Sequence, residues 1–259
     1  MFEKELQAMK AAAVLAEQAI LEIYHTNFKV EIKSDNSPVT KADKTADKLI
    51  REYLHRLFPT YAFLTEESKD DKSRLTNDYV FIVDPVDGTK EFVARDGEFT
   101  TNIALCYKHE IVAGLIHVPT KDFMYWALKG KGAFLERKGG EPIPLKVSNR
   151  TKDLRVLISR SFFNEKEKAM IEKHHDQIID VHPLGAALKF GAIAEGVADL
   201  TYRFSPNTKE WDIAPGVLLV EEAGGVVVKP DLTKYTFNRE DPYNREGYIV
   251  ANRIENVLL

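Results

Sequence analysis

Acidic residues gather at points of this 259-residue sequence where predicted strands or helices end or begin. Glu66 and Glu67 follow one short apolar run, Asp84-Pro85-Val86-Asp87-Gly88-Thr89 follows a second run that is apolar throughout, and Asp212 stands at a predicted helix start. Carboxylates that leave adjacent strand ends cannot all ionise together without strong mutual repulsion. Hard divalent cations remove that repulsion, and clusters of carboxylate oxygens suit Mg²⁺ or Mn²⁺. The sequence therefore predicts a metal site with oxygen ligands.

A further carboxylate, Asp43, falls on the apolar face of a predicted helix. The helix spans about 41–58, after Ser37-Pro38-Val39-Thr40 and before Pro59. At 100° per residue Asp43 lies within its apolar arc, which comprises Ala42, Ala46, Leu49, Ile50, Tyr53, Leu54 and Leu57. An ionised carboxylate on a buried face is costly unless it is paired or bound to a cation. Asp43 is therefore a candidate member of the same site.

The turn formed by Asp87, Gly88 and Thr89 adds an element that can bind an anion. Glycine lets the backbone approach a ligand closely, and consecutive N–H groups in such a turn can hold an anion. Asp212 is expected to be a helix N-cap, because Pro215 is tolerated in the first turn of a helix. A helix start beside a metal-bound carboxylate is a second favourable place for phosphate. Together these features predict phosphoryl chemistry.

Each acidic motif alone is most often a turn, a solvated loop or a helix cap. Four such coincidences together are improbable, so we favour the metal site.

The single cysteine, Cys106, and the scattered histidines disfavour zinc. With 36 Lys and Arg against 40 Asp and Glu, the chain does not resemble a protein that binds nucleic-acid polymers. No apolar run is long enough for a transmembrane segment, so we expect a cytoplasmic protein; peripheral membrane association stays open.

The elements that must position these residues form two mixed α/β halves. The first begins with an amphipathic helix whose apolar positions include Leu6, Met9 and Ile20, and continues with an antiparallel meander. Strands are expected over 62–64, 79–83, 101–107, 111–118, 123–128, 133–135, 154–159, 178–181, 198–202 and 226–228, and later helices over 165–174, 186–195 and 213–223. The best linker candidate is 139–144. We therefore expect an N-terminal half over 1–144, which carries the metal motifs, and a C-terminal half over 145–259, which carries substrate-binding elements and the last metal ligand.

The combination of motifs resembles the inositol monophosphatase superfamily across nearly the whole chain. The signatures are Glu66-Glu67-Ser68, the block from Asp84 to Thr89, and Trp211-Asp212 with Gly224-Gly225. Within the superfamily the chain is most similar to the 3′(2′),5′-bisphosphate nucleotidase branch, the CysQ type. That similarity rests on Lys90-Glu91-Phe92, Gly97-Glu98-Phe99-Thr100, Asn102-Ile103-Ala104-Leu105, Ser159-Arg160-Ser161, Leu188-Lys189-Phe190, Tyr202-Arg203-Phe204 and Thr208-Lys209-Glu210.

The resemblance implies a layered αβαβα sandwich, often dimeric, that hydrolyses phosphomonoesters with two or three Mg²⁺ ions, for which Mn²⁺ is a possible substitute. It assigns metal ligands to Glu66, Asp84, the carbonyl of Val86, Asp87 and Asp212, with Glu67 behind them. It makes Asp43, Thr89 and Glu66 catalytic, with Asp43 paired to the Thr89 hydroxyl near the attacking water. It places Gly88, Thr89, Gly185, Ala186, Lys189 and Arg203 against a small phosphorylated substrate.

Two departures from the branch pattern lie in the substrate half. Gly185-Ala186-Ala187 lack the two hydroxyls usual there, and Phe162 replaces a histidine. The favoured function is hydrolysis of the 3′-phosphate of adenosine 3′,5′-bisphosphate, and the enzymatic alternative is a broad-range inositol-1-phosphate or sugar phosphatase. A catalytically silent metal- or nucleotide-binding homologue is the third reading. Both Lys189 and Arg203 also have a purely structural interpretation. Lys189 could extend its ammonium group to solvent, and Arg203 could form an ion pair with Glu195.

Overall fold

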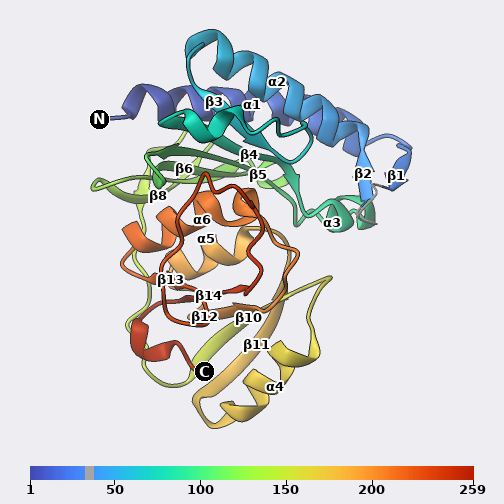
Figure 1. Cartoon of the computed structure of the whole chain (residues 1–259). Coiled ribbons are helices and arrows are strands. Elements are labelled where there is room, and N and C mark those ends of the chain that lie inside the picture. Colours follow the sequence, from blue (N-terminus) through green and yellow to red (C-terminus); the bar gives the residue numbers. More distant parts are fainter. Residues whose placement is uncertain (33–37) are drawn as a thin grey trace.

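A computed structural model describes residues 1–32 and 38–259 as five layers (Figure 1). Two helices cover one face of a seven-stranded sheet, two helices lie between that sheet and a five-stranded sheet, and one helix covers the outer face of the smaller sheet. The helices are α1 (Glu3–Tyr24), α2 (Lys41–Leu57), α3 (Thr89–Ala94), α4 (Glu165–Lys173), α5 (Leu188–Ala194) and α6 (Glu210–Glu222). The predicted αβαβα sandwich is confirmed.

The seven-stranded sheet follows chain order and ends in the predicted meander. Its strands are β3 (Ala62–Thr65), β4 (Tyr79–Asp87), β5 (Thr100–Tyr107), β6 (Glu110–Val118), β7 (Phe123–Leu128), β8 (Gly132–Arg137) and β9 (Ile143–Pro144). β3 and β4 are parallel, whereas the later neighbours are antiparallel. The linker candidate 139–144 therefore ends in a strand of this sheet, because Ile143 pairs with Leu135.

The five-stranded sheet contains later parts of the chain. Its strands, in the order β11-β10-β12-β14-β13, are β11 (Ile178–Leu184), β10 (Leu154–Ser159), β12 (Leu200–Arg203), β14 (Tyr248–Ala251) and β13 (Val226–Val228). β10 runs parallel to both β11 and β12, and β14 runs antiparallel to its neighbours. β1 (Val30–Ile32) pairs antiparallel with β2 (Pro38–Thr40) in a small separate sheet, and the Ser37 of the predicted helix start lies outside the described residues. The division into an N-terminal half over 1–144 and a C-terminal half over 145–259 stays a prediction.

Burial explains why the early helices and β4 form as predicted. The inner face of α2 includes Ala42, Ala46, Ile50 and Leu54, which pack with α1 against the large sheet. Leu57 was expected on this face but is exposed, since it ends the helix beyond the packed surface. β4 is buried at every position from Val80 to Val86, as expected for a strand covered on both faces.

Helix α6 occupies the centre of the molecule, and two glycines allow its close packing. A Cβ on Gly114 of β6 would lie 2.9 Å from the carbonyl oxygen of Pro215, and a Cβ on Gly216 would lie 2.3 Å from the Phe190 ring. The backbone of α6 therefore rests directly on the large sheet and on α5. This fixes the first turn of α6, which contains Asp212, relative to the end of β4 (Figure 1).

The start of α6 differs from the prediction. The helix begins at Glu210, so Asp212 is its third residue and not its N-cap. Its carboxylate accepts the backbone N–H of the capping residue Lys209 at 2.6 Å. Pro215 consequently lies in the second turn of the helix, where its missing N–H leaves one helical bond unmade.

No helix in the part of the chain that the structure describes is long and apolar enough to cross a membrane.

Candidate active site

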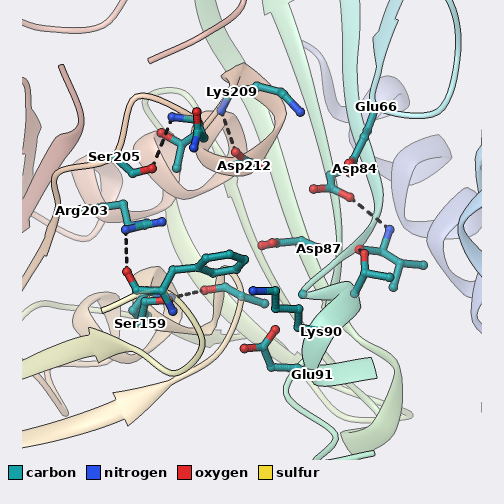
Figure 2. A pocket seen from close by; sticks show the side chains of 18 of the residues that line it. Glu66, Asp84, Asp87, Lys90, Glu91, Ser159, Arg203, Ser205, Lys209 and Asp212 are labelled. Carbon is teal, nitrogen blue, oxygen red and sulfur yellow. Dashed lines mark hydrogen bonds between the residues drawn. The ribbon is translucent and has the colours of Figure 1, made fainter. Parts of the chain in front are cut away.

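A pocket opens where the end of β4, the start of α6 and the loop before α5 meet (Figure 2). Its lining contains carboxylates, cations and aromatic rings: Pro38, Glu66, Asp84, Val86, Asp87, Gly88, Thr89, Lys90, Glu91, Ser159, Phe162, Ala186, Lys189, Arg203, Ser205, Asn207, Thr208, Lys209, Asp212, Tyr243 and Tyr248. Most of the predicted site residues are thus brought together. Asp43, Glu67 and Gly185 do not line the pocket.

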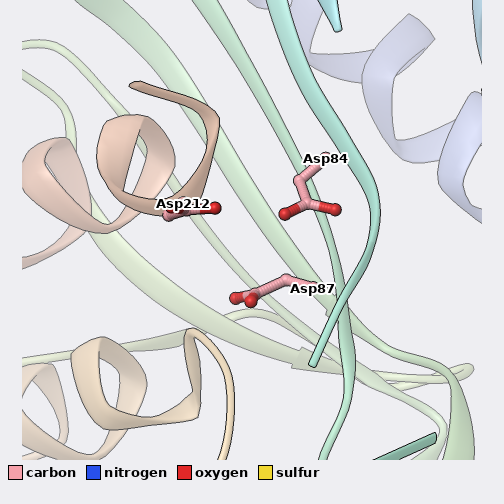
Figure 3. A group of neighbouring side chains, drawn as sticks. All are labelled: Asp84, Asp87 and Asp212. Atoms are coloured by element: carbon pink, nitrogen blue, oxygen red, sulfur yellow. The ribbon is translucent and has the colours of Figure 1, made fainter. Parts of the chain in front are cut away.

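Three carboxylates converge in this pocket (Figure 3). Asp84, Asp87 and Asp212 each offer an oxygen, and these oxygens all lie within 4.8 Å of one another. The register of β4 with β5 shifts between Asp84 and Asp87, and Asn102 donates to Asp87 Oδ2 at 3.1 Å. Asp212 arrives from α6, more than 120 residues later in the chain, because of the packing described above.

Burial makes this arrangement unfavourable for three charges without a counter-ion. Burial raises the pKa of Asp84 well above its usual range, and the charges of Glu66, Asp87 and Asp212 raise it further. Burial raises the pKa of Asp87 to about 6, although Lys189 and the hydrogen bond from Asn102 act against this. The pKa of Asp212 rises to about 8 from burial and the charges of Asp87 and Glu66. Protons or a cation must therefore neutralise the cluster.

The donor set fits a hard divalent cation. All three groups are carboxylates, and they are gathered from two distant segments by rigid elements. Glu66 lines the same pocket at the end of β3, next to β4, and its backbone N–H donates to the Val83 carbonyl at 3.2 Å. The cluster could therefore bind a metal ion through oxygen atoms alone.

Asp43 lies behind the pocket and is held at two points. Its Oδ2 accepts the backbone N–H and the hydroxyl of Thr40, at 2.8 and 2.6 Å, in the capping box that begins α2. Its Oδ1 accepts the hydroxyl of Thr89 at 3.2 Å. Burial raises the pKa of Asp43, and the Glu66 charge adds to this, while the bonds from Thr40 oppose it. The predicted pairing of Asp43 with Thr89 is present, and helix capping is a second reason for its burial.

Gly88 connects the acidic cluster to the substrate half. Its φ of +89° is in the left-handed region, and a Cβ there would lie 3.1 Å from the Glu98 carbonyl and 3.2 Å from the Ala186 side chain. Thr89, the first residue of α3, also donates to the Val86 carbonyl at 3.3 Å. The turn at 87–89 is therefore fixed against the loop at 185–187.

The residues predicted to contact the substrate have defined structural partners. The Gly185 N–H donates to Glu98 at 2.7 Å, and Glu98 also receives two bonds from Arg160. Ala186 has a positive φ of 48°. Lys189 donates to the carbonyls of Leu184 and Ala186, at 3.1 and 2.7 Å, and burial lowers its pKa. These contacts hold the loop before α5 against the turn at 87–89.

Arg203 pairs with a residue that the sequence did not indicate. Its guanidinium donates to Glu167 at 3.0 Å and to the Phe162 carbonyl at 2.9 Å. The alternative pairing with Glu195 is wrong, because Arg203 pairs with Glu167, whereas Glu195 accepts the hydroxyl of Tyr125. Arg203 nevertheless lines the pocket (Figure 2).

Two buried carboxylates near the site were missed. Asp47 lies one turn after Asp43 on the same face of α2 and accepts the Ser68 hydroxyl at 2.8 Å, which ties α2 to the loop that carries Glu66. Glu91 is buried beside the pocket and accepts the Ser161 hydroxyl at 2.6 Å. The four-residue spacing from Asp43 could have indicated Asp47, whereas nothing local indicates the partner of Glu91.

A sequence profile of the inositol monophosphatase family matches residues 3–258. The chain belongs to the inositol monophosphatase family. As a member of this family it is a phosphatase, and its fold and acidic pocket agree with that assignment.

Individual relatives refine the comparison. The chain is 36% identical over 218 residues to the 3′(2′),5′-bisphosphate nucleotidase CysQ of Escherichia coli K12. The matched region covers 82% of this chain and 85% of that protein. The crystal structure of CysQ from Bacteroides thetaiotaomicron, at 34% identity, superposes with a TM-score of 0.84 over 98% of this chain and 99% of that one. The crystal structure of the extragenic suppressor protein suhB of Bartonella henselae, at 28% identity, superposes with a TM-score of 0.81 over 96% of this chain and 94% of that one.

We expect cation binding to stabilise the protein more at high pH. The raised carboxyl pKa values stabilise the metal-free fold below about pH 4, and this contribution is lost as pH rises through the values of about 6 and about 8. A cation binds the deprotonated groups and restores the lost stability. Saturating MgCl₂ should therefore raise the Tm more at pH 8 than at pH 5.5, as measured by differential scanning calorimetry. The prediction would be contradicted if MgCl₂ raised the Tm equally at both pH values. It would also be contradicted if the Asp87→Asn variant showed the same difference between the two Tm increases as the wild type.

Proposed function

We propose that this chain is a Mg²⁺-dependent phosphomonoesterase that removes the 3′-phosphate of adenosine 3′,5′-bisphosphate. The observation that carries the proposal is the convergence of Asp84, Asp87 and Asp212 within 4.8 Å in a pocket that also holds cationic side chains. Relatives at 34–36% identity named CysQ support the nucleotide substrate. A cytoplasmic location and a homodimer remain predictions.

The chain's own groups suggest how the site would work. Glu66, Asp84, Asp87, Asp212 and the Val86 carbonyl would hold two or three Mg²⁺ ions, and Glu67 would support Glu66 from behind. When bound, such ions supply Lewis-acid activation of water and charge stabilisation for phosphoryl transfer.

Thr89 and Asp43 would manage the proton of the attacking water. The Thr89 hydroxyl donates to Asp43 Oδ1, so the lone pairs of its oxygen are oriented away from Asp43 and can accept a proton from water. Asp43, buried and with a raised pKa, can receive the Thr89 proton in turn. The N–H groups of Gly88 and Thr89 would hold the scissile phosphate. Gly185, Ala186, Lys189 and Arg203 would form the nucleotide side.

A second candidate is a broad-range inositol-1-phosphate or sugar phosphatase. It is favoured by the absence of hydroxyls at Ala186 and Ala187, and by the engagement of Lys189 with backbone carbonyls and of Arg203 with Glu167. A silent homologue is disfavoured, because the carboxylates of the site are all retained.

Phosphate release from three substrates tests the proposal. With Mg²⁺ present, we expect kcat/KM for adenosine 3′,5′-bisphosphate to exceed that for myo-inositol-1-phosphate and fructose-1,6-bisphosphate by at least about tenfold, equivalent to about 1.4 kcal/mol of transition-state binding. Asp87→Asn, which removes one ligand charge, is the metal-site control and should abolish turnover of all three. A preference for the inositol ester would support the second candidate, and no release from any substrate would support a silent homologue.

A mutant cycle tests the relay from Thr89 to Asp43. Thr89→Ala and Asp43→Asn should each lower kcat by about 10²- to 10⁴-fold, the usual contribution of a positioned proton-transfer group. The double variant should be little worse than either single one, because groups that act as a unit are not additive. Circular dichroism and thermal unfolding control for the capping role of Asp43. Losses that multiply in the double variant would show independent roles.

A further inference from the structure

Four cationic side chains of the described residues line the pocket, and they differ in how they are held. Lys189 donates to the Leu184 and Ala186 carbonyls, and Arg203 to Glu167 and the Phe162 carbonyl. Lys209 lies against the rings of Trp211 and Tyr243, at 5.3 and 5.4 Å. These three are anchored in the wall of the pocket.

Lys90 is held differently. Across residues 1–32 and 38–259, its ammonium makes no hydrogen bond or ion pair, and its Nζ lies 3.9 Å from the centre of the Phe162 ring. Phe162 is itself 49% exposed. The adjacent carboxylate, Glu91, is turned to the Ser161 hydroxyl and does not pair with Lys90. A cation on an exposed ring is held less firmly than one that is paired with a phosphate.

The position of Lys90 suits a group next to the scissile phosphate. It directly follows Gly88 and Thr89, and its side chain extends into the same cavity as those of Asp87 and Arg203 (Figure 2). The Arg203 guanidinium lies 5.5 Å from the centre of the same Phe162 ring, so both cations are close to this ring. A flexible lysine here can move from the ring to an anionic substrate group without breaking any ion pair in the described structure.

We propose that Lys90 selects substrates with a second phosphate: its ammonium leaves the Phe162 ring and pairs with that phosphate. This rests on the proposed nucleotidase function and adds to it the residue that distinguishes two phosphates from one. Lys189 and Arg203 then shape the wall of the pocket, and Lys90 is the cation that responds to the ligand.

Substrates that differ by one phosphate test this directly. Compared with the wild type, Lys90→Met should raise KM for adenosine 3′,5′-bisphosphate by at least about tenfold, because a charge-assisted contact is lost. KM for adenosine 3′-monophosphate and all kcat values should change by less than about twofold. Lys90→Arg should retain most of the preference for the bisphosphate, since the charge remains. Lys48→Met, the same change on the exposed face of α2, should leave both KM values unchanged.

Product inhibition gives a second readout, because adenosine 5′-monophosphate keeps the second phosphate after hydrolysis. Lys90→Met should raise its inhibition constant by at least about tenfold and leave that of inorganic phosphate unchanged. Equal changes for both inhibitors and both substrates, or no change, would overturn the role of Lys90. If the wild type prefers the bisphosphate and Lys90→Met keeps that preference, only this inference fails. If the wild type shows no such preference, the nucleotidase function fails with it.

Discussion

Mutual repulsion among three clustered carboxylates, of which Asp84 is buried and Asp87 and Asp212 are partly buried, is the constraint on which this structure depends. Asp84, Asp87 and Asp212 place oxygens within 4.8 Å of one another, close enough for their charges to repel strongly. Their raised pKa values express this cost in the metal-free protein. The surrounding fold holds them together against that repulsion, which leaves a site that a divalent cation can neutralise.

Contacts made by residues outside the pocket lining maintain this arrangement. Gly114 lets α6 rest on β6, and the buried carboxylate of Glu210 accepts the backbone N–H groups of Asn238 and Arg239, at 2.7 and 2.9 Å. The Arg239 side chain donates to the same carboxylate at 3.0 Å. The first turn of α6 is therefore fixed from both sides, and Asp212 with it.

A second group of contacts connects the metal side to the substrate side. Glu98 lies beside the large sheet, yet its carboxylate accepts bonds from Arg160 and the Gly185 N–H in the substrate half. Glu91 makes an equivalent connection to Ser161. The loop before α5 and the segment after β10 are thus held relative to the carboxylates by polar contacts with residues 91 and 98.

The sequence was most informative where a local pattern carried the information. The apolar run before Asp84 indicated a buried strand ending in carboxylates, and the helical arc indicated that Asp43 is buried. Local patterns failed in two places. Asp212 was predicted as the N-cap of its helix, but Lys209 is the N-cap and Asp212 is the third residue of α6. Arg203 pairs with Glu167, a distant residue that no local pattern indicated. The assignment of metal ligands and substrate contacts comes from the family resemblance and stays a prediction.

Calorimetric titration of the metal-free protein with MgCl₂ at pH 7, in two buffers with different ionisation enthalpies, tests the central claim most directly. Because burial and the charges of Asp87 and Glu66 raise the pKa of Asp212 to about 8, we expect the metal-free cluster to hold a proton at this pH. Cation binding should release at least about one proton per protein molecule, and Asp212→Asn should weaken binding and reduce that release. Binding without proton release, or binding unaffected by Asp212→Asn, would contradict the account.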